Sequence, residues 1–177
     1  MAVLRLTNVS DRSRELPGYW DQRMNEHWHE PTHGLYVNRT GLDRMDARNL
    51  RVLRNLVAGR GVSVLECACG YGRYFESFAR YTPEVRSYLG IDVAERNIVE
   101  AKRLHGDNGG SFQVADMATI KTAERFDLIF MVAAMSSIES RSQEIIDHLK
   151  TLLLPAGSIA IFEEDCYMII DGAWNAP

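Results

Sequence analysis

Residues 62–72 of the chain, Val-Ser-Val-Leu-Glu-Cys-Ala-Cys-Gly-Tyr-Gly (VSVLECACGYG), hold the pattern that decides the fold. Their first six residues form a short, mostly apolar run that is typical of a buried parallel strand. Gly70 and Gly72 follow, and glycine lets the backbone turn sharply and approach a ligand where a side chain would collide with it. We therefore expect a strand, then a tight loop that faces a ligand, then a helix.

The rest of the chain alternates between strand-like and helix-like stretches. Four more short apolar runs cover residues 87–92, 111–116, 126–132 and 158–163. Helical spacing of apolar residues covers residues 42–56, 74–80, 95–104 and 140–153. This alternation predicts an α/β fold, a Rossmann-like, doubly wound, mostly parallel sheet of about five strands with helices on both faces.

The composition indicates one globular domain. At 177 residues, 46% of them hydrophobic and 25% charged, the chain is long enough for one stable core. Residues 1–41 lack periodicity and contain several prolines and glycines, so we expect an N-terminal cap on a domain formed by residues 42–177. The formal net charge of -4 argues against nucleic acid as a partner. No apolar run approaches the roughly 20 residues of a membrane span, so we expect a cytoplasmic protein with no membrane partner.

Neither the cysteines nor the histidines predict a metal site. Cys67, Cys69 and Cys166 are too few and too unevenly spaced for a disulfide framework or a zinc finger. Residues 29–33 (HEPTH) match the His-Glu-x-x-His pattern of zinc peptidases, which requires a continuous helix. Pro31 lacks an amide donor and clashes in a helix interior, so we expect no metal there.

An acidic residue stands at the spacing that an adenosine-binding sheet requires. Asp92 ends the second predicted strand, twenty residues after Gly72, where a carboxylate accepts hydrogen bonds from ribose hydroxyls. A dinucleotide would also need a glycine at position 75, which is Phe75 here, so a dinucleotide-dependent oxidoreductase is the weaker alternative. Glu66, four residues before Gly70, suits an ammonium group, which S-adenosylmethionine carries where a dinucleotide carries phosphates.

Residues 62–164 resemble the class I S-adenosylmethionine-dependent methyltransferases. Their first motif is an acid followed by three glycines at alternate positions, and the stretch from Glu66 to Gly72 resembles it with Ala68 in place of the first glycine. Four further stretches resemble later motifs of the family in the same order, namely residues 88–97 (YLGIDVAERN), 112–117 (FQVADM), 126–138 (FDLIFMVAAMSSI) and 153–158 (LLPAGS).

The resemblance implies S-adenosyl-L-methionine as the cofactor and a role for individual residues. Asp92 would take the ribose hydroxyls, and Val93 from the same motif would lie against adenine. Asp116 would lie near the adenine amino group, with Met117 on the ring. The predicted cofactor-binding residues are Tyr19, Arg23, Glu66, Ala68, Gly70, Gly72, Asp92, Val93, Asn97, Asp116, Met117 and Met131.

The leader is expected to supply the substrate side of the site. Residues 18–23 (GYWDQR) resemble the Tyr-Trp-x-x-Arg segment that opens many small-molecule methyltransferases. In that segment aromatic residues cover the cofactor and an arginine meets its carboxylate, which implies these roles for Tyr19 and Arg23. The alternative is that Tyr19 and Trp20 serve as a hydrophobic anchor for the leader.

A general base is needed only when the methyl acceptor must first lose a proton. Many small-molecule methyltransferases have His-His where this chain has Ser136 and Ser137, so a base would have to come from elsewhere. His29 and His33 in the leader are the candidate catalytic residues. Their alternative is a surface position on the cap without a chemical role.

The C-terminal end departs from the family pattern. Members continue past the fifth strand with a helix and two antiparallel strands, whereas fourteen residues follow Glu163 here. We therefore expect those two strands to be missing and the fifth strand to be an exposed edge that a homodimer partner covers. The predicted function is methyl transfer to a small-molecule acceptor, and the alternative is a non-catalytic S-adenosylmethionine-binding protein, either regulatory or a relic.

Overall fold

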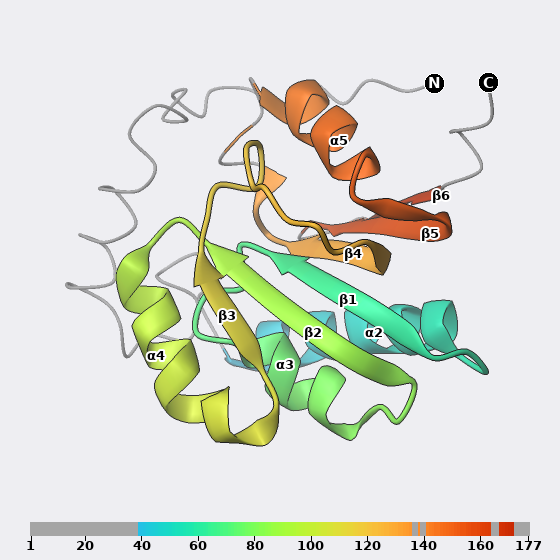
Figure 1. Ribbon diagram of the computed structural model, residues 1–177. Helices are drawn as coiled ribbons and strands as arrows, with labels where there is room; N and C mark the ends of the chain where they lie inside the picture. The colour runs from blue at the N-terminus through green and yellow to red at the C-terminus, as the bar shows by residue number, and fades with distance from the viewer. Residues whose placement is uncertain (1–38, 136–137, 139–140, 164–166, 172–177) are drawn as a thin grey trace.

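A computed structural model describes residues 39–135, 138, 141–163 and 167–171 of the chain (Figure 1). The helices are α2 (Arg39–Val57), α3 (Arg73–Ser77), α4 (Glu95–His105) and α5 (Ser142–Lys150). The strands are β1 (Val62–Cys67), β2 (Val85–Asp92), β3 (Ser111–Val114), β4 (Phe126–Val132), β5 (Leu153–Phe162) and β6 (Tyr167–Asp171).

These strands form one sheet in the order β3-β2-β1-β4-β5-β6. The first five are parallel to their neighbours, and β6 is antiparallel to β5. The chain therefore runs outward from β1 in one direction and outward from β4 in the other, which is the doubly wound topology. The predicted fold class is confirmed.

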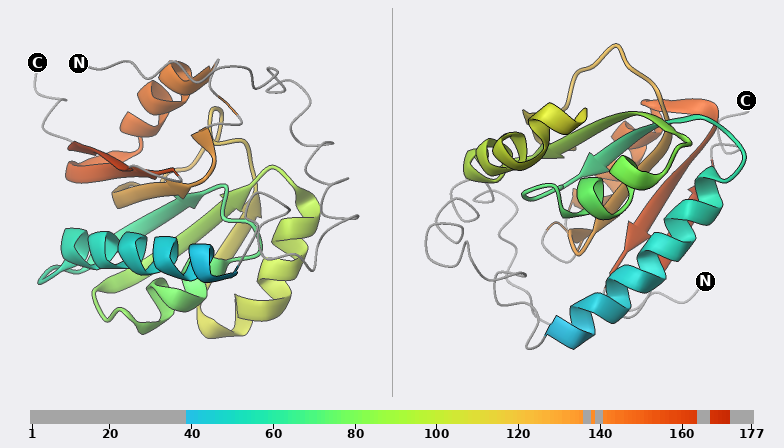
Figure 2. Two further views of the ribbon diagram at one scale, coloured as in Figure 1. Left: turned by 180° about the vertical axis from the view of Figure 1, so that it is seen from behind. Right: turned by 90° about the horizontal axis from the view of Figure 1, so that it is seen from below.

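Two hydrophobic clusters cover the two faces of the sheet. Side chains alternate along a strand, so Val64 faces one cluster and Leu65 the other. The Val64 cluster is shared with helices α2, α3 and α4, and the Leu65 cluster with helix α5. Figure 2 shows α2 and α3 together on the face opposite α5. Burial on both faces of β1 and β4, and of the second half of β5, explains why these strands are continuous apolar runs in the sequence, whereas most of β3 is exposed.

Several predicted helix ends differ from the structure: α2 begins at Arg39, inside the predicted cap, α3 ends at Ser77 instead of residue 80, and the third difference lies between α5 and β5. Helical spacing predicted a helix over residues 140–153, but α5 ends at Lys150 and Leu153 already begins β5. Leu152 and Leu153 are buried in the Leu65 cluster, as the predicted apolar stripe required. However, Leu152 belongs to the turn after α5, and Leu153 belongs to β5. Pro155 disfavours helical conformation only at Leu154, and α5 already ends four residues before Leu154, where the amide and the hydroxyl of Thr151 both donate to the carbonyl of His148. The stretch 153–158 is therefore part of the fifth strand and not a turn before it.

Strand β6 corrects the prediction for the C-terminal end. It pairs along β5 from Ser158 opposite Asp171 to Phe162 opposite Tyr167. The expectation that both strands after the fifth are missing is therefore wrong for one of them, and β5 is not an exposed edge. An antiparallel partner needs only a short connection, which is why so few residues suffice. The prediction of a homodimer was based on an exposed edge at β5, and this edge is covered by β6.

Within the described residues, no helix is both long enough and apolar enough to cross a membrane.

Candidate functional site

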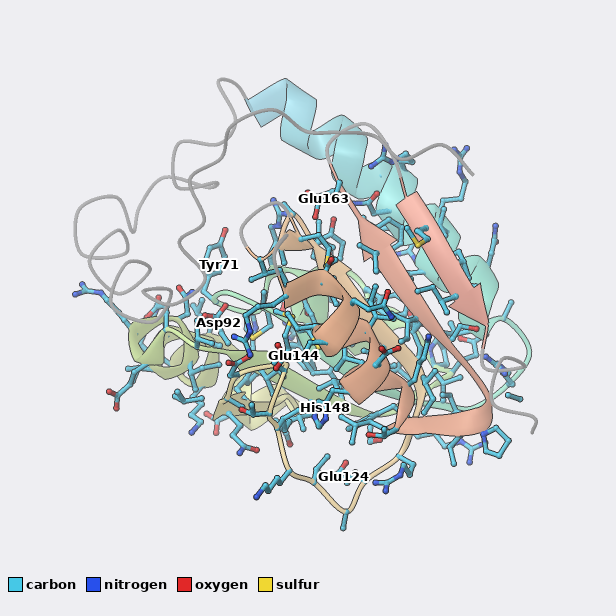
Figure 3. All side chains as sticks on the ribbon, turned by 90° about the horizontal axis from the view of Figure 1, so that it is seen from above. Tyr71, Asp92, Glu124, Glu144, His148 and Glu163 are labelled. Atoms are coloured by element: carbon cyan, nitrogen blue, oxygen red, sulfur yellow. The ribbon has the colours of Figure 1, made fainter. Side chains whose placement is uncertain are left out.

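The carboxyl ends of the five parallel strands meet at one edge of the sheet. In a doubly wound sheet, ligands bind at this edge, at the point where the strand order reverses. Here that point lies between β1 and β4, which pair directly, with Cys67 opposite Met131. In Figure 3, Tyr71 and Asp92 lie near each other, and Glu163 lies at the end of β5.

The backbone is in the left-handed region directly after both central strands. Ala68 follows β1 with φ 56° and Ala133 follows β4 with φ 53°, and they are the two non-glycine residues with positive φ in the described part of the chain. Such a conformation costs a non-glycine residue about 1–2 kcal/mol and is concentrated at functional sites. Ala68 was a predicted site residue, whereas no sequence signal marked Ala133.

The two glycines of the β1 loop need their lack of a side chain for different reasons. Both have positive φ, 56° at Gly70 and 85° at Gly72. A Cβ on Gly72 would lie 2.6 Å from the ring of His105, so helix α4 can pack closely against the loop only if this residue is glycine. A Cβ on Gly70 would meet no atom of the described residues within 4 Å, so its α-carbon borders a space that the described part of the chain leaves open.

Asp92 joins the loop after β1 to the loop after β2. One carboxylate oxygen accepts a hydrogen bond from the Gly70 amide at 2.9 Å, and the other accepts one from the Ala94 amide, also at 2.9 Å. Ala94 directly precedes helix α4, so the carboxylate also holds the start of that helix. The side chain is largely buried, with the residue 8% exposed.

Glu66 lies buried beneath the β1 loop. The residue is 2% exposed, and its carboxylate accepts a hydrogen bond from the hydroxyl of Tyr88 on the neighbouring strand β2. Burial is the main cause that raises the pKa of Glu66 to about 8; the charges of Asp92 and Asp46 act in the same direction, and the Tyr88 hydrogen bond and the charge of Arg73 oppose it. The sequence analysis did not find Tyr88, because only the register of β1 against β2 brings the two side chains together.

Asp116 holds the loop after β3. One of its carboxylate oxygens accepts a hydrogen bond from the Ala118 amide at 2.8 Å, and the other lies 3.2 Å from a guanidinium nitrogen of Arg141. Of the apolar residues predicted nearby, Met117 is 8% exposed and Met131 is completely buried in the Leu65 cluster. The position of Met131 is that of a core residue.

Helix α4 supplies the remaining described candidates. Val93 precedes this helix and is half-buried. Asn97 is buried in its first turn, and its side-chain oxygen has no hydrogen-bond partner in the described part of the chain. A buried acceptor without a donor is uncommon in proteins.

The end of β5 forms the other side of this edge. The Glu163 carboxylate accepts a hydrogen bond from the Met135 amide at 2.8 Å, and its main-chain carbonyl accepts one from Arg48 on α2 at 3.0 Å. The amide of Ala133 donates to the carbonyl of Phe162 at 2.8 Å. The sequence analysis placed Glu163 inside a strand and missed this role, although an acid at a strand end was the available signal.

Other predicted residues lie outside the described part of the chain. They are Tyr19, Arg23, His29, His33, Ser136 and Ser137. Cys67 and Cys69 are described as free and buried, and burial raises the pKa of both thiols, so neither is a reactive thiolate. Among the described residues, no group of three or more His, Cys, Asp or Glu side chains could hold a metal ion.

The fold is that of a doubly wound α/β protein whose topological switch point lies between β1 and β4. The family model of the methyltransferase domain matches residues 64–157, just over half of the chain, and the chain belongs to this family. No curated protein matches it in sequence.

Solved structures share the fold at low sequence identity. The N-methyltransferase NodS from Bradyrhizobium japonicum WM9, in complex with S-adenosylhomocysteine, is 24% identical over 79% of this chain and 70% of its own, with a TM-score of 0.63. The magnesium protoporphyrin IX methyltransferase ChlM from Synechocystis PCC 6803, with bound S-adenosylmethionine, is 17% identical over 89% of this chain and 77% of its own, with a TM-score of 0.66. The [4+2]-cyclase SpnF is 19% identical over 82% of this chain and 57% of its own, with a TM-score of 0.65.

Proposed function

We propose that the protein binds S-adenosylmethionine at the carboxyl edge of its sheet and transfers the methyl group to a small-molecule acceptor. The observation that carries the proposal is the hydrogen bond from the Gly70 amide to the Asp92 carboxylate. It places an acidic side chain beside a loop in which the α-carbon of Gly70 borders a space that the described residues leave open. Membership of the methyltransferase domain family supports it. So do the structures of NodS and ChlM, which contain S-adenosylhomocysteine and S-adenosylmethionine respectively.

The described residues fit this cofactor. The space next to Gly70 admits a ligand against the backbone, and the ring of His105 leaves no corresponding space at Gly72. The unpartnered oxygen of Asn97 is a buried acceptor that a hydroxyl or amino group of a ligand would satisfy. Glu66 and Asp92 place two acidic groups at the first two strand ends, which suits a cofactor with an ammonium group and no phosphate.

Each described residue has a proposed role. Asp92, at the end of β2, accepts hydrogen bonds from the ribose hydroxyls. Glu66 releases its proton to solvent when the ammonium group binds and then stabilises that group, and Val93 and Met117 lie against the adenine ring. When bound, the cofactor supplies an electrophilic methyl group, and the protein positions the acceptor and excludes water around it.

The substrate side stays a set of predictions. We propose residues 1–41 as the cap, with Tyr19 covering the cofactor, Arg23 meeting its carboxylate, and His29 or His33 as the base. The net charge of -4 favours a small molecule over nucleic acid as the acceptor. A cytoplasmic location and a homodimer also stay predictions, and light scattering at micromolar concentration checks the second.

A methyl-transfer assay tests the proposal. Intact protein is incubated with S-adenosylmethionine tritiated in the methyl group and with metabolite extracts filtered to remove macromolecules. We expect tritium in a low-mass product, with none formed by the Asp92→Ala variant. Tritium found only in protein or nucleic acid, from an unfiltered extract, would contradict a small-molecule acceptor.

A second candidate is S-adenosylmethionine binding without methyl transfer. In the described part of the chain, no histidine directly follows a parallel strand, and the imidazole of His105, which packs against Gly72, is buried, so the described edge offers carboxylates and no accessible imidazole as a base. The fold itself is compatible with another reaction, because SpnF is a cyclase by name. Tight binding of S-adenosylhomocysteine with no labelled product from any extract would favour this candidate.

A further inference from the structure

We propose that Arg141 positions the Asp116 carboxylate so that it accepts a hydrogen bond from the adenine amino group and rejects a 6-oxo purine. This inference rests on the proposed function. Arg141 belongs to the segment between β4 and α5, far in sequence from Asp116, and no pattern in the sequence connected the two residues. Its role is that of a positioning residue, which acts on the cofactor through Asp116.

The Asp116 carboxylate has one orientation because both of its oxygens are engaged. The Ala118 amide lies 2.8 Å from one oxygen, and the Arg141 guanidinium lies 3.2 Å from the other. The amides of Thr119 and Ile120 also donate to the main-chain carbonyl of Asp116, at 3.0 and 2.9 Å. Backbone and side chain of Asp116 are therefore held together as one rigid acceptor group.

The engaged carboxylate can still accept from a ligand. A carboxylate has about four lone-pair sites, so two hydrogen bonds leave room for an amino group. The Asp116 side chain is 38% exposed, so its remaining lone pairs are accessible. Because Arg141 donates to it, the carboxylate is stabilised as an acceptor without a proton, which favours an amino group and disfavours a carbonyl oxygen.

Arg141 is itself held in place. Its amide donates to the carbonyl of Ile138 at 2.9 Å, and Ile138 is buried in the Leu65 cluster beside Met117 and Ala118. Its guanidinium also pairs with Glu144 one turn along α5, at 3.3 Å. The Arg141 side chain is 24% exposed and lies between the two carboxylates. Glu144 thus keeps the guanidinium extended toward Asp116.

Without the guanidinium, the Asp116 carboxylate would be free to rotate, and the oxygen that Arg141 engages would be free to bind water. The adenine amino group would then form a weaker hydrogen bond with the carboxylate, and the carboxylate would repel the oxygen of a 6-oxo purine less strongly. The affinity ratio of two ligands that differ only at this position therefore reports the role of Arg141. A general loss of fold or of affinity would lower both affinities and leave the ratio unchanged.

The experiment measures binding of S-adenosylhomocysteine and of S-inosylhomocysteine, its 6-oxo analogue, by calorimetry. Intact wild-type protein is expected to prefer the amino form by at least about tenfold, the value of one hydrogen bond to a charged group. Arg141→Ala and Arg141→Gln are expected to reduce that preference about tenfold. Arg125→Ala is the matched control, because Arg125 is exposed and its side chain bonds to the carbonyls of its own loop, at residues 122–124.

A double-mutant cycle completes the test. Asp116→Ala should lose the preference by itself, and adding Arg141→Ala to it should change the ratio by less than about twofold. An unchanged ratio in both single Arg141 variants would overturn the inference, whether or not the two affinities fall together. Failure of the wild-type protein to bind S-adenosylhomocysteine at all would instead contradict the proposed function itself.

Discussion

The carboxylate of Asp92 accepts a hydrogen bond from the amide of Gly70 at 2.9 Å, which ties together the loops that follow β2 and β1. The same carboxylate accepts from Ala94 at the start of α4. A side chain proposed to bind ribose thus also sets the shape of the loop beneath the cofactor. The site is therefore prepared by the protein's own hydrogen bonds and does not depend on a ligand to bring the two loops together.

Gly70→Ala is expected to weaken binding of S-adenosylhomocysteine by at least about tenfold. The new methyl group would point into the open space next to the loop, where the structure has no atom within 4 Å. The left-handed backbone would also cost about 1–2 kcal/mol of stability. Calorimetric titration gives the affinity, and urea unfolding gives the stability.

Gly59→Ala is the matched control for this substitution. Gly59 also has a positive φ, 74°, with nothing within 4 Å of an added Cβ, but it lies in the turn before β1, away from the edge. It should lose a similar amount of stability and keep its affinity. Equal affinities of the two variants would show that the space beside Gly70 is not where the cofactor binds.

The buried carboxyl of Glu66 predicts a pH dependence of stability. Its pKa is raised from 4.5 to about 8, so between these values the folded protein holds a proton that the unfolded chain lacks. Stability from this group is full below about pH 4.5 and is lost as the pH rises through about 8. The free energy of unfolding should therefore fall by up to about 1.4 kcal/mol per pH unit within this window.

Glu66→Gln isolates this contribution, because the amide does not titrate and still accepts the Tyr88 hydrogen bond. Urea unfolding at several pH values between 5 and 8 should give a steeper decline for the wild type than for the variant. Parallel declines would mean that Glu66 is ionised in the folded protein and that its surroundings are more polar than the structure indicates.

Tyr74→Phe is expected to cost about 1–3 kcal/mol of stability. The Tyr74 hydroxyl donates to Asp46 at 2.6 Å and accepts from Asn49 at 3.1 Å, which joins α3 to α2. Asn49 is completely buried, so its amide would lose a partner without gaining water. Tyr81→Phe is the control, since Tyr81 is 64% exposed and should lose less than about 0.5 kcal/mol. Similar urea midpoints for both variants would exclude an anchoring role for this contact.

Much of the fold could be predicted because its signals are local. Apolar runs located the five parallel strands, whereas the end of α5 at Lys150 had no local marker, because Pro155 restricts only Leu154. Strand β6 was missed although residues 166–170 (CYMII) form an apolar run, because the comparison with the family pattern indicated that the chain is too short for strands after the fifth.

The candidate site was predictable only in part, for a related reason. Gly70 and Asp92 follow strands at a fixed spacing, so the sequence indicated them directly. The partners of the acidic residues, Tyr88 for Glu66 and Arg141 for Asp116, are set by strand register and by the path of a distant segment. Such contacts between residues far apart in sequence require the three-dimensional structure.

Calorimetric titration of the intact protein with S-adenosylhomocysteine, alongside Asp92→Ala, tests cofactor binding most directly. We expect one site per chain with a dissociation constant between about 1 μM and 1 mM, the range common among enzyme substrates. Asp92→Ala should weaken binding by at least about tenfold, because it removes charged hydrogen bonds to the ribose. Asp107→Ala, at an exposed acid on the turn after α4, should bind like the wild type. No heat of binding from the folded wild-type protein, or equal affinity of wild type and Asp92→Ala, would contradict a cofactor site at this edge.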